Sequence, residues 1–236
     1  MSGSTAVIEL ELYLVRHGYS RGKAGIPAET IEEYHNPGLT ELGQRQAELL
    51  GERFSALPLD CIISSGLERA IVTAEEVAKR QPEDGFHNVE VHPLFTEINL
   101  PEDYPGHTFE EIHASHPDTL AAPGTEKYTR FAISSMTHES QRARAREAVD
   151  YLRSRFKNGE KVLVAAHGAF NTDIFFTALK IEDPPAFDIS FFNTNVTKIV
   201  FYKEGTGYYN CDVGLIYAND CSHLAAEFPT YTLNKL

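Results

Sequence analysis

The chain has 236 residues, of which 42% are hydrophobic and 23% charged, a composition typical of a soluble globular protein. Its formal net charge of −13, from 34 acidic and 21 basic residues, disfavours binding to nucleic acid or to anionic lipid. No apolar run reaches the length of a membrane span, and residues 1–10 lack the pattern of a secretory signal. Cys61, Cys211 and Cys221 show neither zinc nor disulfide spacing, so we expect a cytoplasmic protein with reduced thiols.

Short apolar runs alternate with helical patterns over most of the chain. The pattern predicts strands at residues 10–15, 61–63, 89–91 and 162–166, and helices from Thr40 to Leu57 and at residues 67–78, 140–156 and 170–179. The last of these strands is apolar throughout, which is typical of a parallel strand covered on both faces. Residues 22–38 read as an irregular stretch.

The rest of the chain is less periodic. Residues 100–138 are expected to form an irregular cap with one short helix near residues 109–114. Residues 194–202 and 208–217 are rich in β-formers and flank a glycine-containing turn, which predicts a hairpin. The predicted fold is a three-layer α/β structure with a mostly parallel central sheet, flanking helices and an antiparallel edge. We expect a single domain over residues 1–236, with the cap as an insertion.

Histidines and arginines follow the predicted strands. Arg16 and His17 come directly after the first strand, and His167 and Gly168 come after the apolar strand near the middle of the chain. The carboxyl ends of parallel strands share one edge of a sheet, so these groups are expected to meet in one pocket. Arg69 opens a helix that follows another strand, where free N–H groups and a guanidinium both favour an anion. The combination predicts a phosphoryl site.

Four segments, in order and spacing, resemble motifs of the histidine phosphatase superfamily. The narrower resemblance is to the branch that includes cofactor-dependent phosphoglycerate mutases and related small phosphatases. The segments are residues 14–18 (LVRHG), 39–47 (LTELGQRQA), 64–74 (SSGLERAIVTA) and 166–168 (AHG). The resemblance covers roughly residues 10–179, and residues 217–224 are similar to a tail motif of some members. It implies a phosphoglycerate mutase-like fold.

The resemblance also implies catalytic roles. His17 matches the family's nucleophile, which forms a covalent phosphohistidine that water then hydrolyses. Arg16, Arg69 and His167 match the positions that hold the phosphoryl oxygens, and no metal or other cofactor is required because the arginines supply the positive charge. Glu97, which follows the third strand, matches the family's general acid–base residue.

Further residues are assigned to substrate binding. Besides Arg16 and Arg69, we expect contacts from Ser20, Lys23, Gly168, Ala169 and His107. Lys23 stands where the family has an asparagine, and its ammonium group is a point charge on a flexible stem. The histidines of the cap lack the carboxylate pattern of a metal site, so none is predicted there.

The leading hypothesis is a metal-independent phosphomonoesterase of the histidine acid phosphatase type, acting on a small phosphorylated substrate. Mutases carry a basic, aromatic stretch after the glutamate, whereas this chain has residues 98–101 (INLP), which favours hydrolysis. Two alternatives stay open: phosphoglycerate mutase-type transfer, and a non-catalytic protein that binds phosphorylated ligands. The substrate's identity is open, and so is the oligomeric state, where a homodimer through the terminal hairpin is one option.

Overall fold

The computed structural model describes residues 6–101, 104–182, 185 and 187–228. Its strands form one seven-stranded sheet in the order β4-β3-β2-β5-β1-β6-β7. The strands are β1 (Ile8–Arg16), β2 (Cys61–Ser64), β3 (Val89–Val91), β4 (Thr119–Ala121), β5 (Glu160–Ala166), β6 (Val196–Tyr202) and β7 (Val213–Asp220). The first five pair in parallel, and β6 and β7 add an antiparallel edge. The predicted mostly parallel sheet with an antiparallel edge is therefore confirmed.

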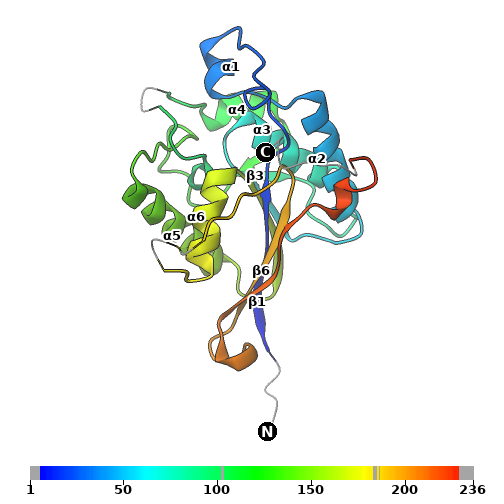
Figure 1. The fold of residues 1–236 in the computed structure, drawn as a ribbon, viewed down its shortest axis with the longest axis vertical. Coiled ribbons are helices and arrows are strands. Elements are labelled where there is room, and N and C mark those ends of the chain that lie inside the picture. The colour runs from blue at the N-terminus through cyan, green and yellow to red at the C-terminus, as the bar shows by residue number, and fades with distance from the viewer. Residues whose placement is uncertain (1–5, 102–103, 183–184, 186, 229–236) are drawn as a thin grey trace.

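Helices cover both faces of this sheet. The α-helices are α1 (Ile31–His35), α2 (Glu41–Phe54), α3 (Glu68–Ala78), α4 (Phe109–Ser115), α5 (His138–Arg155) and α6 (Gly168–Ala178), and short 3₁₀ turns are η1 (Pro93–Phe95), η2 (Tyr208–Asn210) and η3 (Ser222–Leu224). Helices α5 and α6 lie on one side of the sheet, and α2 and α3 lie on the other (Figure 1). None of the helices in the described ranges is long and apolar enough to cross a membrane.

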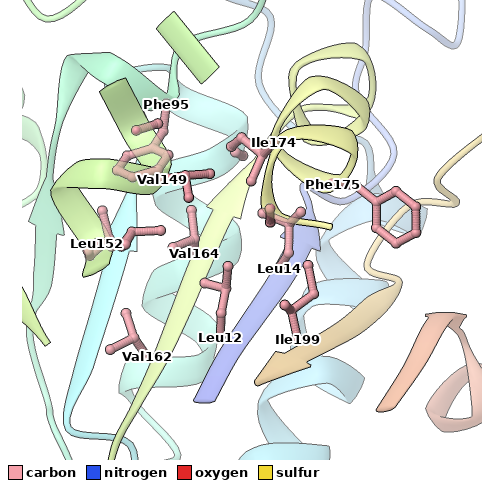
Figure 2. Close-up of a cluster of buried hydrophobic side chains, with 14 of the residues drawn as sticks. Leu12, Leu14, Phe95, Val149, Leu152, Val162, Val164, Ile174, Phe175 and Ile199 are labelled. Atoms are coloured by element: carbon pink, nitrogen blue, oxygen red, sulfur yellow. The ribbon is translucent and has the colours of Figure 1, made fainter. Parts of the chain in front are cut away.

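The core has two halves because side chains alternate along the central strands. Leu12 and Leu14 of β1 face the α5–α6 side, whereas Tyr13 and Val15 face α2 and α3. Figure 2 shows the first half, where β1, β5 and β6 meet α5 and α6 through Leu12, Leu14, Val149, Leu152, Val162, Val164, Ile174, Phe175 and Ile199. Each fully buried aliphatic side chain of this kind stabilises the fold by roughly 1.5–3 kcal/mol. This double covering explains why β5 is continuously apolar from Val162 to Ala166.

The second strand of the terminal hairpin lies later than predicted. Residues 208–217 were expected to be its second strand, but Tyr208–Asn210 form η2 and β7 begins at Val213. Tyr209 and Asn210 adopt left-handed backbone angles, with φ of 54° and 60°, far from the extended angles of a regular strand. Phe201 pairs with Val213, so the connection between the strands is longer than the glycine turn suggested.

Regular structure also occurs in the two segments expected to be irregular. Helix α1 lies within residues 22–38, with the hydroxyl of Thr30 as its N-cap. In the cap, α4 confirms the short helix, but β4 was missed: Thr119 pairs with Val89, and the strand extends the sheet beyond β3. Three residues are too few to show a period of two, so the sequence carried no signal for β4. Residues 102 and 103 of the cap lie outside the described residues.

Candidate active site

Two histidines meet at the carboxyl ends of adjacent strands. Strands β1 and β5 pair in parallel with Arg16 opposite Ala166, so the next residue of each chain segment, His17 and His167, is a neighbour in space. Their ring centroids are 5.1 Å apart, and both side chains are buried. The structure therefore brings together the pair that the strand-end argument had placed in one pocket.

The hydrogen bonds of His17 define its protonation. Its Nδ1 lies 2.7 Å from the carbonyl oxygen of Gly18, and a carbonyl only accepts, so Nδ1 carries the proton. The Nε–H of Arg69 donates to the other ring nitrogen, Nε2, over 3.3 Å. Burial lowers the pKa of His17 well below its usual range, and the charges of Arg69 and Arg16 lower it further. His17 is thus a neutral imidazole whose Nε2 lone pair faces a guanidinium.

The two arginines are held differently. Arg16 donates from Nη1 to the carbonyl of Phe191 over 2.6 Å, and its guanidinium passes so close to Gly168 that a Cβ there would lie 3.2 Å from Nε. Arg69 is buried in the first turn of α3, where its Nη1 has no hydrogen-bond partner among the described residues. Burial lowers the pKa of Arg69 to about 10, so it remains charged at neutral pH. A buried cationic N–H without an acceptor is suited to bind an anionic oxygen.

Glu97 lies at the N-terminus of α6. Its Oε1 accepts the N–H of Phe170, the third residue of that helix, over 3.1 Å and the N–H of Ile98 over 3.0 Å. The helix has no side-chain cap from its own N-cap residue, His167, so Glu97 satisfies a free N–H there. The carboxylate lines a cavity of about 510 Å³ together with Arg16, Lys23, Gly168 and Ala169. Five of the predicted site residues therefore share this cavity, hereafter the catalytic cavity.

The remaining predicted binding residues lie in two places. Ser20 is buried beneath the loop, where its Oγ accepts the backbone N–H of Lys23 over 3.4 Å. Lys23 is exposed at the rim of the catalytic cavity. His107 does not line this cavity: it donates from Nε2 to Glu32 over 2.8 Å and borders a second cavity of about 1400 Å³ formed largely by residues 21–38.

The turn after β1 is held by α2. The backbone N–H of Tyr19 donates to Oε1 of Gln46 over 2.9 Å, and its carbonyl accepts the hydroxyl of Thr40 over 3.0 Å. Gly43 packs against Tyr19 so closely that a Cβ would overlap its backbone. These are residues of the 39–47 motif, so that motif positions the backbone next to His17.

Two polar side chains that the sequence interpretation gave no role also hold this turn. Thr73 of α3 accepts the N–H of Gly18 over 3.0 Å and donates to the carbonyl of Arg69 over 2.7 Å. Asn193, fully buried, donates from Nδ2 to the carbonyl of His17 over 2.7 Å. The sequence feature that could have indicated a role for Asn193 is the polar run of residues 193–195 (NTN) directly before β6.

The tail motif at residues 217–224 contacts the segment that precedes β6. Asn219 accepts the N–H of Phe192 on Oδ1 and donates from Nδ2 to the carbonyl of Ser190, each over 2.9 Å. It therefore ties β7 to the segment that carries Asn193. The motif contributes through backbone positioning.

Arg144 of α5 was also missed, and it supports Glu97. It is buried, donates from Nη2 to the carbonyl of Glu97 over 3.4 Å and from Nη1 to the carbonyl of Ile133 over 3.2 Å. Its guanidinium carbon lies 4.1 Å from the ring centroid of Phe170, the residue that donates to the Glu97 carboxylate. Arg144 thus contacts both the backbone of Glu97 and the ring of Phe170.

The site suits attack on phosphorus. Arg16 and Glu97 line the catalytic cavity, whereas His17, which follows Arg16 in the chain, and Arg69, which donates to His17, are not among its lining residues. Together they supply a nucleophile, anion donors and a proton carrier. Within the described ranges, no group of three or more His, Cys, Asp or Glu side chains is arranged to hold a metal ion.

A mostly parallel sheet with this histidine pair at its strand ends defines the phosphoglycerate mutase-like class of α/β proteins. Residues 12–210 match the histidine phosphatase superfamily (branch 1), and the chain belongs to this family. The resemblance drawn from the four sequence motifs is confirmed.

Curated relatives carry both mutase and phosphatase names. "Probable phosphoglycerate mutase GpmB" of Photorhabdus laumondii is 41% identical over 70 residues, 30% of this chain and 31% of the relative. "Phosphoserine phosphatase 1" of Hydrogenobacter thermophilus is 39% identical over 70 residues, 30% of this chain and 32% of the relative. Each match spans about a third of the relative's length, so their names do not decide the activity of this chain.

Solved structures match over nearly the whole chain. YhfR of Bacillus stearothermophilus is 27% identical with a TM-score of 0.61, over 91% of this chain and 99% of that chain. Mycobacterial glucosyl-3-phosphoglycerate phosphatase is 25% identical with a TM-score of 0.60, over 89% and 98%. Phosphoglycerate mutase of Bacillus anthracis, 20% identical with a TM-score of 0.61 over 94% and 97%, shares the fold.

Proposed function

We propose that the chain is a metal-independent phosphatase that hydrolyses a small phosphomonoester through a covalent phosphohistidine on His17. The observation that carries this proposal is the protonation of His17: Nδ1–H is engaged by the Gly18 carbonyl, so Nε2 keeps its lone pair beside Arg69. Such a nitrogen can attack an anion that the neighbouring guanidinium holds.

The proposed reaction uses the groups of the site described above. Arg16, Arg69 and His167 donate to the phosphoryl oxygens, and Arg69 exchanges its bond to His17 for one to the substrate. Nε2 of His17 forms a bond to phosphorus as the bond to the leaving oxygen breaks, and the carboxyl group of Glu97 gives that oxygen a proton. Glu97, now a carboxylate, takes a proton from water as the water attacks phosphorus, and inorganic phosphate and neutral His17 are released.

Hydrolysis rather than return transfer is supported by the residues directly after Glu97. Ile98 lines the catalytic cavity, and Oδ1 of Asn99 accepts an amide N–H from Gln141 over 3.0 Å. A mutase must retain the dephosphorylated acid until the phosphoryl group returns, which requires cations for its carboxylate. Arg16 and Lys23 are the cations among the described residues that line the cavity, and both adjoin the phosphoryl position.

The proposal is tested with a panel of phosphorylated metabolites, measuring inorganic phosphate against isomerised product. We expect phosphate release, no effect of chelators, inhibition by vanadate, and a quenched ³²P-labelled phosphoenzyme that is labile in acid and stable in base. His17→Ala is expected to abolish both turnover and labelling, and His87→Ala, which alters an exposed histidine, to leave them unchanged. Isomerised product without net phosphate would establish the mutase, and ligand binding without turnover on any substrate would establish the non-catalytic protein.

A further inference from the structure

The second histidine has one ring nitrogen engaged and one without a partner. Nε2 of His167 lies 2.7 Å from the hydroxyl of Ser65, and both side chains are fully buried. Nδ1 is also buried and has no hydrogen-bond partner among the described residues. Burial lowers the pKa of His167 well below its usual range, with Arg69 and His17 lowering it further, so the ring carries one proton at neutral pH. The nitrogen that holds this proton decides what His167 can do.

The proton is located by counting the bonds of Ser65. Its Oγ already accepts the backbone N–H of Leu67 over 3.3 Å, and its own proton needs an acceptor. Among the described residues, the acceptor within reach is Nε2 of His167. If Nε2 carried the ring proton, the hydroxyl would be a buried donor without an acceptor, which costs about 1–3 kcal/mol. Ser65 therefore donates to Nε2, and the ring proton lies on Nδ1.

We propose that Ser65 is a positioning residue that keeps the proton of His167 on Nδ1, making that N–H a donor to the phosphoryl group bound at His17. This inference rests on the proposed function. The two rings then present opposite nitrogens: His17 offers the Nε2 lone pair for attack, and His167 offers a neutral N–H to an oxygen. The difference is set by their partners, a carbonyl oxygen for His17 and a hydroxyl group for His167.

Two substitutions at His167 test which nitrogen donates. His167→Asn places an amide N–H near the position of Nδ1, and His167→Gln places one near the position of Nε2. Since loss of one oxyanion donor costs about 10²–10³-fold in kcat, we expect the Asn variant to retain at least about tenfold more kcat/KM than the Gln variant. The reverse order, or equal losses, would overturn the proposal.

Ser65→Ala tests the serine, with Ser64→Ala as its matched control. Ser64 is an equally buried neighbour whose hydroxyl donates to the carbonyl of Ser65 over 2.9 Å. We expect Ser65→Ala to lower kcat/KM about tenfold, the equivalent of one hydrogen bond, and Ser64→Ala to change it less than twofold. When Ser65→Ala is added to His167→Asn, we expect little further decrease in kcat/KM, because the asparagine has no Nε2 for Ser65 to bind.

The ring proton is read directly by ¹⁵N NMR of histidine-labelled protein. We expect protonated Nδ1 on His167 in the unsubstituted protein and in Ser64→Ala, and a shift towards protonated Nε2 in Ser65→Ala. Protonated Nε2 in the unsubstituted protein, or an unchanged ring in Ser65→Ala, would refute the inference even if the enzyme is a phosphatase. Absence of a phosphoenzyme on His17 with the expected NMR result would instead refute the proposed function.

Discussion

At the scale of single residues, the carboxyl group of Glu97, the proposed acid, is oriented by backbone contacts. Two backbone N–H groups fix Oε1, and Arg144 holds the backbone of the same residue. Glu97 also lines the catalytic cavity. An acid oriented in this way typically contributes about 10²–10⁴-fold to a rate.

Glu97→Gln is expected to slow phosphoenzyme formation most for substrates with poor leaving groups. An alkyl phosphate requires a proton on its departing oxygen, so its rate should fall by about 10²–10⁴-fold, whereas nitrophenyl phosphate should lose much less. Single-turnover measurements on both substrates provide the comparison. Equal losses on the two substrates would remove Glu97 from the role of acid.

Among the elements, α2 contacts the turn that follows β1 and carries His17. It contributes no group to the catalytic cavity, but Thr40 and Gln46 bind the backbone of Tyr19, and Gly43 allows the helix to approach it. The family resemblance in residues 39–47 therefore reflects the geometry of the turn that carries His17.

Gly43→Ala is expected to damage both stability and activity. The added methyl group overlaps the backbone of Tyr19, and overpacking of this kind costs typically about 1–3 kcal/mol. Gly38→Ala is the matched control, since its Cβ would meet the Glu68 side chain at an ordinary 3.7 Å. Urea unfolding and kcat/KM of both variants provide the measurement. A fully active Gly43→Ala would show that α2 does not position the turn.

His116 connects the cap to α3 and makes this connection depend on pH. Its imidazole bonds to Glu68 over 2.8 Å and to Glu75 over 3.1 Å, and these hydrogen bonds raise its pKa to about 9. The folded-state pKa exceeds the unfolded value near 6.5, so the stabilisation is complete below about pH 6.5 and is lost as pH rises through about 9.

His116→Gln should therefore lower the free energy of unfolding at pH 6 and have little effect at pH 10. Denaturant unfolding of the variant and the unsubstituted protein at both pH values gives this difference. His113→Gln, on helix α4, which His116 caps at its C-terminus, serves as the comparison, since His113 bonds to the carbonyl of Thr119 rather than to a carboxylate. If His116→Gln lowered the free energy of unfolding equally at both pH values, the charged interaction of His116 with Glu68 and Glu75 would be contradicted.

The sequence predicted those features that depend on short patterns. Apolar runs marked the central strands, and the rule for parallel strands placed His17 and His167 together. The partners of these histidines depend on long-range contacts that no local pattern encodes: Asn193 bonds to a residue 176 positions away, and Ser65 to one 102 positions away. His107 was expected to contact the substrate, but the structure places it beside a different cavity, where it bonds to Glu32.

For the whole molecule, the charges that line the catalytic cavity lead to a prediction about the proposed substrate. The chain carries a net charge of −13, and the catalytic cavity is lined by Glu97, Asp173 and Asp188 beside Arg16 and Lys23. With the cations adjoining the phosphoryl group, a carboxylate on the leaving group would face other carboxylates. Like charges in partly buried sites repel by about 1–4 kcal/mol at 4 Å.

Of two phosphorylated substrates that differ only in a carboxylate group, we expect the one that carries the carboxylate to be hydrolysed less efficiently. We expect kcat/KM for glycerol 3-phosphate to exceed that for 3-phosphoglycerate by about tenfold or more, equivalent to about 1.4 kcal/mol. Asp188→Asn should narrow this gap, and Glu204→Gln, on the exposed hairpin turn, should not. A preference for the acid in the unsubstituted protein would contradict this electrostatic argument.

The order of strands in the sheet has a consequence for biosynthesis. Strand β5 lies between β1 and β2, although nearly a hundred residues of chain separate it from β2. As the polypeptide leaves the ribosome, its first two strands cannot pair with each other in the native arrangement, and the vacant central place persists until residues 160–166 emerge. A nascent chain of this protein therefore exposes two unpaired apolar edges while the residues between β2 and β5 are translated, and a chaperone that covers such edges would act in that interval.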